Sequence, residues 1–164
     1  MTRIRLKTCI LAVASLLALV SPGRAATHYV DIAGTNAVSP YTNWVTAATR
    51  IQDALDVAMN GEEVLVADGV YNTGAATAGG FALTNRIAIT NAVAVRSVNG
   101  PTNTIIEGSD APGPASVRCA YLGVNAVLIG FTLTNGHTLT AGLWDEIVGG
   151  GAWCDLTAVV SNCV

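Results

Sequence analysis

AVLIGFTLTNG, residues 126–136, is the stretch that decides the fold. In an extended chain, one side of it carries Val127, Ile129, Phe131 and Leu133, and the other carries Leu128, Gly130, Thr132 and Thr134. This period of two predicts a β-strand with one buried face. Asn135-Gly136, which closes the stretch, is a pair typical of tight turns.

Similar strands recur along the chain at nearly constant intervals. EVLVADG, RIAITNAVAVRSVNG and LTAVVSNCV alternate in the same way. When Val64, Val93, Val127 and Val159 are taken as equivalent, the steps are 29, 34 and 32 residues. Self-similarity of this length indicates a solenoid, because each repeat buries its apolar side only against its neighbours. A β-sandwich is the alternative, and it predicts short hairpin turns between adjacent strands.

The first residues have the pattern of a secretory signal peptide, which we place at residues 1–25. Basic residues at positions 3, 5 and 7 precede an apolar run over 9–20, and the small residues Ala25 and Ala26 follow. The run is shorter than the roughly 20 residues of a membrane span, so no stable span is expected after cleavage. A retained anchor is the alternative. We expect an exported protein, extracellular or on the cell surface, with the periplasm as another location.

Cleavage makes the mature chain, residues 26–164, strongly acidic. It keeps four arginines and no lysine against eleven acidic residues, a formal charge near −7. Such a surface repels phosphate backbones, which argues against a nucleic-acid partner. Cys119, Cys154 and Cys163 remain, and their spacing fits no zinc site. They are interpreted either as small buried apolar residues or as partners in a disulfide.

One helix is expected ahead of the strands, over residues 46–60. Its apolar residues recur with helical spacing, at Ile51, Ala54, Leu55 and Ala58. Thr46 or Thr49 can cap its start, and Gly61 supplies a left-handed stop. Such a helix would cover the open end of a solenoid whose rungs run over about 62–164.

Three stretches resemble a known family. WVTAATRIQDALDVAMNGEEVLVADGVY (44–71) resembles the N-terminal cap and first rung of right-handed parallel β-helix proteins of the pectate-lyase-like superfamily, and VRSVNGPTNTIIEG and LGVNAVLIGFTLTNG resemble later rungs. The likeness is greatest to secreted bacterial repeat proteins. It implies an all-β, right-handed parallel β-helix with an N-terminal amphipathic capping helix. The superfamily holds polysaccharide lyases, hydrolases and esterases beside adhesins without known catalysis, so the shared fold does not define an activity.

No catalytic residue and no metal site are predicted. A lyase of this superfamily would need calcium held by several carboxylates on adjacent rungs. The spacing of Glu107, Asp110, Asp145, Glu146 and Asp155 places no such group on one face. No cofactor is therefore expected, and calcium would enter only if the chain were a lyase.

HTLTAGLWDEIVGGG, residues 137–151, interrupts the strand pattern and holds the candidate binding residues Trp144, Asp145 and Glu146. An exposed aromatic ring beside carboxylates can stack on a sugar, which has an apolar face and a polar rim. The alternative is that Trp144 packs against the solenoid wall.

Two functions remain from the sequence. The first is a non-catalytic, adhesin-like surface module that contacts polysaccharide or another cell-surface component. The second is a carbohydrate-active enzyme, a polysaccharide lyase or glycoside hydrolase, whose catalytic rungs lie beyond Val164. Because residues 156–164 form an alternating strand with no polar cap, we expect an uncapped C-terminal end and a longer parent protein.

Overall fold

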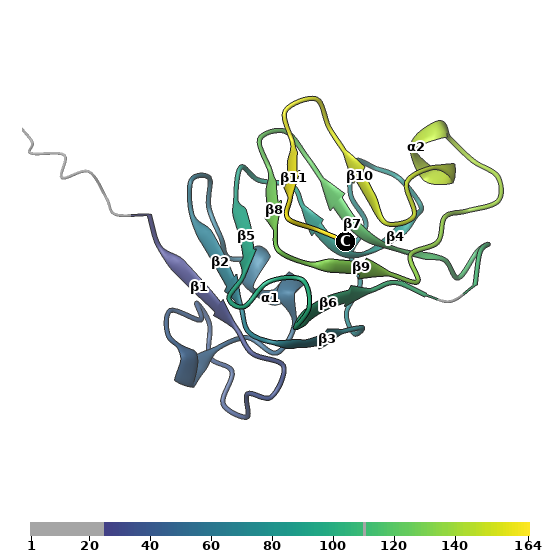
Figure 1. Ribbon diagram of the computed structural model, residues 1–164. Helices are drawn as coiled ribbons and strands as arrows, with labels where there is room; N and C mark the ends of the chain where they lie inside the picture. Colours follow the sequence, from purple (N-terminus) through teal and green to yellow (C-terminus); the bar gives the residue numbers. More distant parts are fainter. Residues whose placement is uncertain (1–24, 110) are drawn as a thin grey trace, which may run out of the picture.

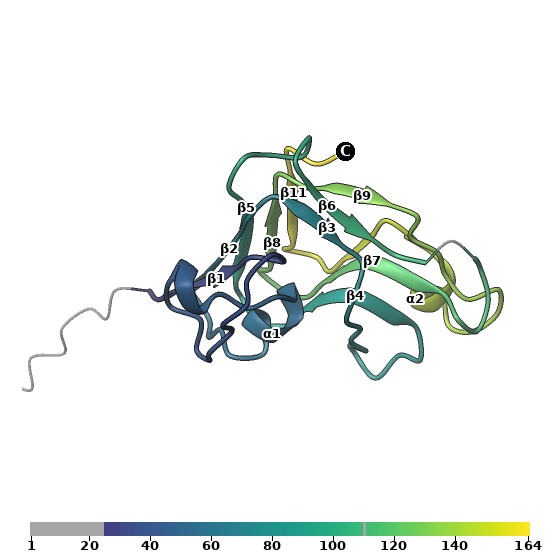
Figure 2. The ribbon, with the colours of Figure 1, turned by 90° about the horizontal axis from the view of Figure 1, so that it is seen from below.

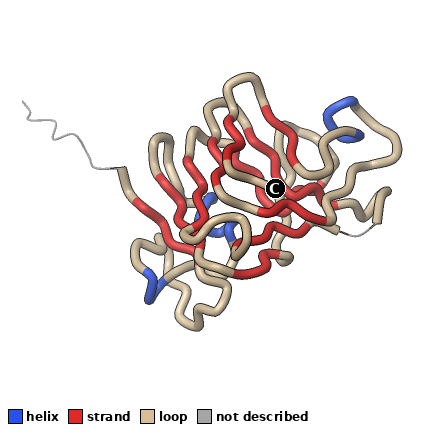
Figure 3. Tube along the Cα trace, in the orientation of Figure 1, coloured by secondary structure: helices blue, strands red, loops and turns tan. Residues whose placement is uncertain are grey.

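The computed structural model describes residues 25–109 and 111–164. Within these ranges the chain is mostly short strands joined by loops, and neighbouring strands in each sheet are parallel (Figures 1 and 3). The predicted signal peptide lies almost wholly outside the described residues. The expected fold class, a parallel β-helix solenoid, is confirmed, and the hairpin sandwich is wrong.

Three parallel sheets form the walls of the solenoid. The first contains β1 (Thr27–Val30), β2 (Glu63–Val66), β5 (Ala94–Ser97), β8 (Val127–Ile129) and β11 (Val159–Ser161). The second contains β3 (Gly69–Tyr71), β6 (Thr104–Glu107) and β9 (Thr132–Thr134). The third contains β4 (Thr84–Ile89), β7 (Val117–Leu122) and β10 (Ala152–Cys154). The chain passes through the three sheets in turn, so each complete turn adds one strand to each.

The register corrects the repeat spacing inferred from the sequence. Glu63, Ala94, Val127 and Val159 occupy one position in the first sheet, so successive turns are 31, 33 and 32 residues long. Val127 and Val159 were matched correctly. Val64 lies one residue after this column and Val93 one residue before it, because the column itself is occupied in these two turns by Glu63 and Ala94.

The stretch over 126–136 is two strands, β8 and β9, and not one. Gly130 stands between them with φ of +83°, a conformation that glycine adopts without strain. A Cβ at this position would lie 2.5 Å from Ser97 Oγ. In one continuous strand, Leu128 and Phe131 would face opposite sides, because they are three residues apart. The corner at Gly130 changes the direction of the chain between them, and both side chains are buried.

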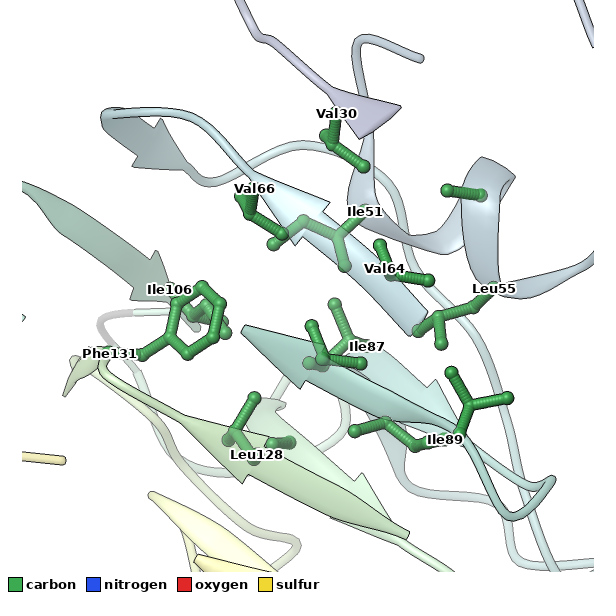
Figure 4. Packing of buried hydrophobic residues seen from close by; sticks show 14 of the residues in the cluster. Val30, Ile51, Leu55, Val64, Val66, Ile87, Ile89, Ile106, Leu128 and Phe131 are labelled. Atoms are coloured by element: carbon green, nitrogen blue, oxygen red, sulfur yellow. The ribbon is translucent and has the colours of Figure 1, made fainter. Parts of the chain in front are cut away.

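The core is a column of aliphatic side chains enclosed by the three sheets. Figure 4 shows Val64, Ile87, Ile106 and Leu128, which come from different sheets and turns, pointing toward a shared interior. Each is at most 1% exposed. Burial of this kind contributes roughly 1.5–3 kcal/mol per large aliphatic side chain.

The capping helix is real but shorter than expected. The helix α1 spans Ile51–Leu55, preceded by a 3₁₀ turn, η1, at Trp44–Thr46. Its N-cap is Arg50, which makes no side-chain capping bond, so the predicted caps Thr46 and Thr49 are wrong. The predicted apolar face is confirmed for Ile51, Ala54 and Leu55, which are buried on α1, and Ala58 is buried just beyond the end of the helix. Gly61 has a positive φ, +86°, but α1 ends at Leu55 with Asp56 as its C-cap, so the prediction that Gly61 stops this helix is wrong.

The helix occupies the place beside β4 where the third sheet has no earlier strand (Figure 2). The Gln52 side chain accepts a hydrogen bond from the Ala88 amide at 2.8 Å and donates one to the Ala88 carbonyl at 3.4 Å. Gln52 thus replaces a neighbouring strand at this point of the β4 edge, which agrees with the expected covering role of the helix.

Three long loops leave the solenoid at the corner between the second and third sheets. Their described residues are 72–83, then 108–109 with 111–116, and then 135–151, and the third loop contains the short helix α2, Trp144–Ile147. The other corners are turned by much shorter segments, with the exception of the first turn, where residues 31–50 form a loop beside β1. These two regions, the three-loop corner and the loop beside β1, carry the cavities described below.

The cysteines in the described part of the chain form no disulfide. Cys119 is fully buried, and its thiol lies 3.1 Å from the Thr134 carbonyl, as expected for a small core residue. Cys154 is exposed and Cys163 is half-buried. The buried interpretation therefore holds for one of the three.

Candidate functional site

The predicted binding residues lie on α2, in the third long loop. Trp144 is 72% exposed, so the interpretation that its ring packs against the wall is wrong. Leu143, just before it, is also exposed. The ring is thus accessible at the predicted place.

The carboxylates beside Trp144 are engaged by the protein itself. Glu146 is buried, and its two oxygens accept hydrogen bonds from the amides of Ala82 at 2.5 Å and Leu143 at 3.0 Å. These bonds, that of Leu143 first, lower the pKa of Glu146. One oxygen of Asp145 accepts the indole N–H of Trp153 at 3.0 Å. The structure therefore does not present the three residues together as an open site.

Arg118 holds the same loop in place through hydrogen bonds to its backbone, a role that sequence reasoning did not predict. Its side chain is 1% exposed. The guanidinium donates to the carbonyls of Gly149 at 3.0 Å and Val148 at 2.9 Å, to the Asp145 carbonyl, and to the Asn85 side chain at 3.3 Å. Burial lowers its pKa. A buried cation with this many acceptors fixes the path of residues 145–149.

An aromatic stack covers the outer face of the third sheet next to this loop. Trp153 and Tyr121 occupy paired positions on β10 and β7, with ring centroids 4.9 Å apart and an interplanar angle of 6°. Phe81, from the first long loop, packs on both rings. We interpret the stack as part of the wall that supports the loops.

A cavity of about 390 Å³ lies where the three long loops meet. Its lining residues are Ala82, Gly113, Pro114, Leu139, Thr140 and Ala141. They are small or aliphatic apart from one hydroxyl, and none is ionisable. This cavity offers little chemistry for specific recognition.

A second cleft, of about 370 Å³, has a different lining. It lies at the corner that follows the first sheet, and its lining residues are Asp31, Trp44, Ala67, Asp68, Val98 and Asn99. Five of them come directly after β1, β2 and β5, whose last residues Val30, Val66 and Ser97 are paired in register. Each of three successive turns therefore contributes residues to the lining of this cleft. We call this feature the corner cleft.

The acidic and amide side chains of the corner cleft are held in place. Asn99 donates to Asp68 Oδ1 at 3.0 Å, across neighbouring turns. Asp31 Oδ1 accepts the Ala33 amide at 2.9 Å. Among the hydrogen bonds of the described residues, none engages the second oxygen of either carboxylate. Each side chain is thus oriented by one bond and keeps an acceptor for a ligand.

Trp44 completes the corner cleft from the loop beside β1. It begins the turn η1, whose N-cap Asn43 accepts the Thr46 amide at 3.1 Å. Its ring meets Tyr29 edge-on, with centroids 4.7 Å apart at 64°. The side chain remains 43% exposed. The indole is therefore supported on one side and open on the other.

Tyr71, on β3 three residues after Asp68, is buried and donates its hydroxyl to the Ala67 carbonyl at 3.0 Å. Burial raises its pKa, and the charges of Asp31 and Asp68 raise it further. The tyrosine hydroxyl therefore stays protonated and holds the carbonyl of Ala67, one of the residues that line the corner cleft.

Sequence reasoning missed the corner cleft, although part of its signal was present. Asp68 and Asn99 each stand two residues after a strand of the first sheet and directly before a glycine. Because the two strands are paired in register, this shared offset indicates that Asp68 and Asn99 occupy equivalent positions on neighbouring turns. The contribution of Trp44 had no such signal, because it comes from the irregular loop.

The fold and this cleft define the class of protein: a parallel β-solenoid with a polar and aromatic cleft at one corner. Comparison of the chain with protein-family models, with curated proteins and with solved structures finds no match.

Two further properties concern residues 25–109 and 111–164 only. No group of three or more His, Cys, Asp or Glu side chains in these ranges is arranged to hold a metal ion. No helix in them combines the length and the apolar composition needed to cross a bilayer.

Proposed function

We propose that the chain is an exported β-solenoid of the pectate-lyase-like type that binds polysaccharide at the cell surface or outside the cell without modifying it. The observation that carries the proposal is the exposed ring of Trp44 beside Asp31, Asp68 and Asn99 in the corner cleft. Aromatic rings stack on the apolar face of a sugar, while carboxylate and amide groups bond its hydroxyls.

The size and rigidity of the corner cleft support this proposal. A volume of about 370 Å³ falls at the lower end of the range for small-ligand sites, which suits one or two sugar units. The walls are consecutive turns of a hydrogen-bonded stack, so the polar groups are positioned before a ligand arrives. Export is supported by the basic, then apolar, then small-residue order of residues 1–25.

Two exposed tryptophans allow a matched test. The mature chain, Trp44→Ala and Trp144→Ala would be compared on an array of neutral, amino and uronic-acid oligosaccharides. We expect Trp44→Ala to weaken binding about tenfold, the value of one lost stacking contact, and Trp144→Ala to leave it unchanged. Circular dichroism would confirm that both variants are folded.

Three results would contradict the proposal. Loss of binding in Trp144→Ala alone would place the site on α2, as the sequence predicted. Binding to no glycan would remove the glycan function. Release of shortened or unsaturated products from a bound polysaccharide would make the chain an enzyme.

A further inference from the structure

We infer that the corner cleft selects sugars that carry a free, protonated amine, such as the glucosamine units of a deacetylated polysaccharide, over neutral and uronic-acid sugars. This inference rests on the proposed function and specifies its ligand. It follows from the charge of the cleft, the position of the indole and the kind of polar atoms that face the ligand.

The charge of the corner cleft is wholly negative. Asp31 and Asp68 lie on neighbouring turns and line the same space, and none of the six lining residues is basic. Parallel strands are about 4.8 Å apart, so the two carboxylates come from adjacent backbone rows. A cationic group in the cleft would reduce their mutual repulsion, whereas a uronic acid would increase it.

The side-chain polar atoms of Asp31, Asp68 and Asn99 that are open to a ligand are mostly acceptors. One N–H of Asn99 is used by Asp68, which leaves its second N–H and three acceptors, namely Asn99 Oδ1 and the second oxygen of each carboxylate. An ammonium group has three donors and no acceptor, so it matches these three acceptors. An acetylated amine has one donor and no charge, and it satisfies the set less well.

Trp44 adds a further preference for a cation. The open part of an indole attracts an ammonium group through the ring quadrupole, and tryptophan is the strongest of the aromatic side chains in this respect. The same ring can stack on the apolar face of the sugar that carries the amine. Trp44 can therefore contact both the apolar face of the sugar and its charged amine.

The test compares tetramers of glucosamine, N-acetylglucosamine and galacturonic acid by calorimetry with the mature chain. Low ionic strength limits the screening of charge interactions, and a pH of about 5.5 lies above the reference pKa of a carboxyl group and below that of an amine. We expect the glucosamine tetramer to bind about tenfold more tightly than the acetylated one, from two ion pairs and one cation–π contact. Galacturonate should bind most weakly.

The double variant Asp31→Asn/Asp68→Asn removes the charges and keeps the acceptors for the Ala33 amide and for Asn99. We expect the preference for glucosamine to fall to about twofold or less in this variant. Asp155→Asn is the matched control. It removes one charge at a different corner, from an aspartate that also accepts a nearby backbone amide, and should keep the preference.

The outcomes separate this inference from the proposed function. If the acetylated tetramer binds as tightly as the free amine, the inference fails and glycan binding stands. If the preference survives the double variant, or is lost equally in Asp155→Asn, the cleft is not its source and the inference fails. If tetralysine bound as tightly as the glucosamine tetramer, the assignment of a sugar as the ligand would also be overturned. If no tetramer binds, both proposals fail.

Discussion

At the scale of single residues, Arg118 is the side chain on which the loop over 135–151 depends most. It is the largest fully buried side chain in the described part of the chain, and its acceptors are backbone carbonyls and one amide oxygen. Without the guanidinium these buried oxygens would lack partners, and each unsatisfied buried group costs about 1–3 kcal/mol.

Arg118→Met should therefore lower the free energy of unfolding by about 3 kcal/mol and speed proteolysis within residues 137–151. Denaturant titration and limited proteolysis with mass spectrometry measure the two effects. Arg96→Met is the control, because Arg96 makes an exposed ion pair with Glu63 and should cost less than about 1 kcal/mol. Equal losses in the two variants would show that burial of Arg118 does not matter.

His28 and Glu62 join the first strand to the turn before β2. The buried His28 ring lies 2.7 Å from the Pro40 carbonyl through Nδ1 and 2.9 Å from Glu62 Oε2 through Nε2. The His28 hydrogen bond, and then the Met59 amide, lower the pKa of Glu62. A carboxylate whose pKa is depressed by folding stabilises the fold above its unfolded pKa, about 4.3, and loses this contribution as pH falls through the folded value.

Glu62→Gln should accordingly reduce stability by about 1 kcal/mol at pH 7 and have little effect below the depressed pKa of Glu62. Urea unfolding midpoints at several pH values would show the wild-type and variant curves converging in acid. Glu63→Gln, which removes the neighbouring charge on an exposed pair, serves as control. A gap between the curves that stayed constant down to pH 2 would rule out the carboxylate as its cause.

At the scale of elements, α1 acts as a substitute strand. Its Gln52 side chain satisfies both backbone groups of Ala88, which is itself almost fully buried. The remaining contact of the helix with the solenoid is apolar. Helix and sheet therefore meet through one specific polar pair set in an apolar surface.

Gln52→Ala should destabilise the protein by about 1–2 kcal/mol, because it leaves a buried amide and carbonyl unpaired. Hydrogen exchange of the Ala88 amide should accelerate more than that of other β4 amides. Asp53→Ala changes the next residue of the same helix but removes only an exposed pair with Arg50, and should change stability by less than about 0.5 kcal/mol. Unaltered exchange at Ala88 would refute the role given to Gln52.

The elements also show why sequence reasoning succeeded only in part. The solenoid and the inward face of α1 were predictable, since both follow from a regular period of apolar residues. The corner at Gly130 was missed because apolar residues stand on both sides of it, so two short strands looked like one long one. Arg118 was missed because a charge between Val117 and Cys119 is usually a sign of a solvent-facing position.

At the scale of the whole molecule, the edges of the first sheet differ. Beyond β1, the loop over 31–50 supplies backbone partners to Tyr29 and Asp31. At the other edge, all three residues of β11 are exposed.

The candidate site could not be predicted as a unit from the sequence. Its residues come together only when three turns of the solenoid and the loop over 31–50 are stacked.

The assembly of the corner cleft from three turns has a mechanical consequence. Along the chain these turns are connected in series, and across the stack they are joined by strand hydrogen bonds, side-chain packing and polar side-chain pairs such as Asn99 with Asp68. A rigid sugar seated against Asp31, Asp68 and Asn99 would form an additional link between turns. Under tension applied to the two ends of the chain, the occupied solenoid would then unravel at a higher force than the empty one.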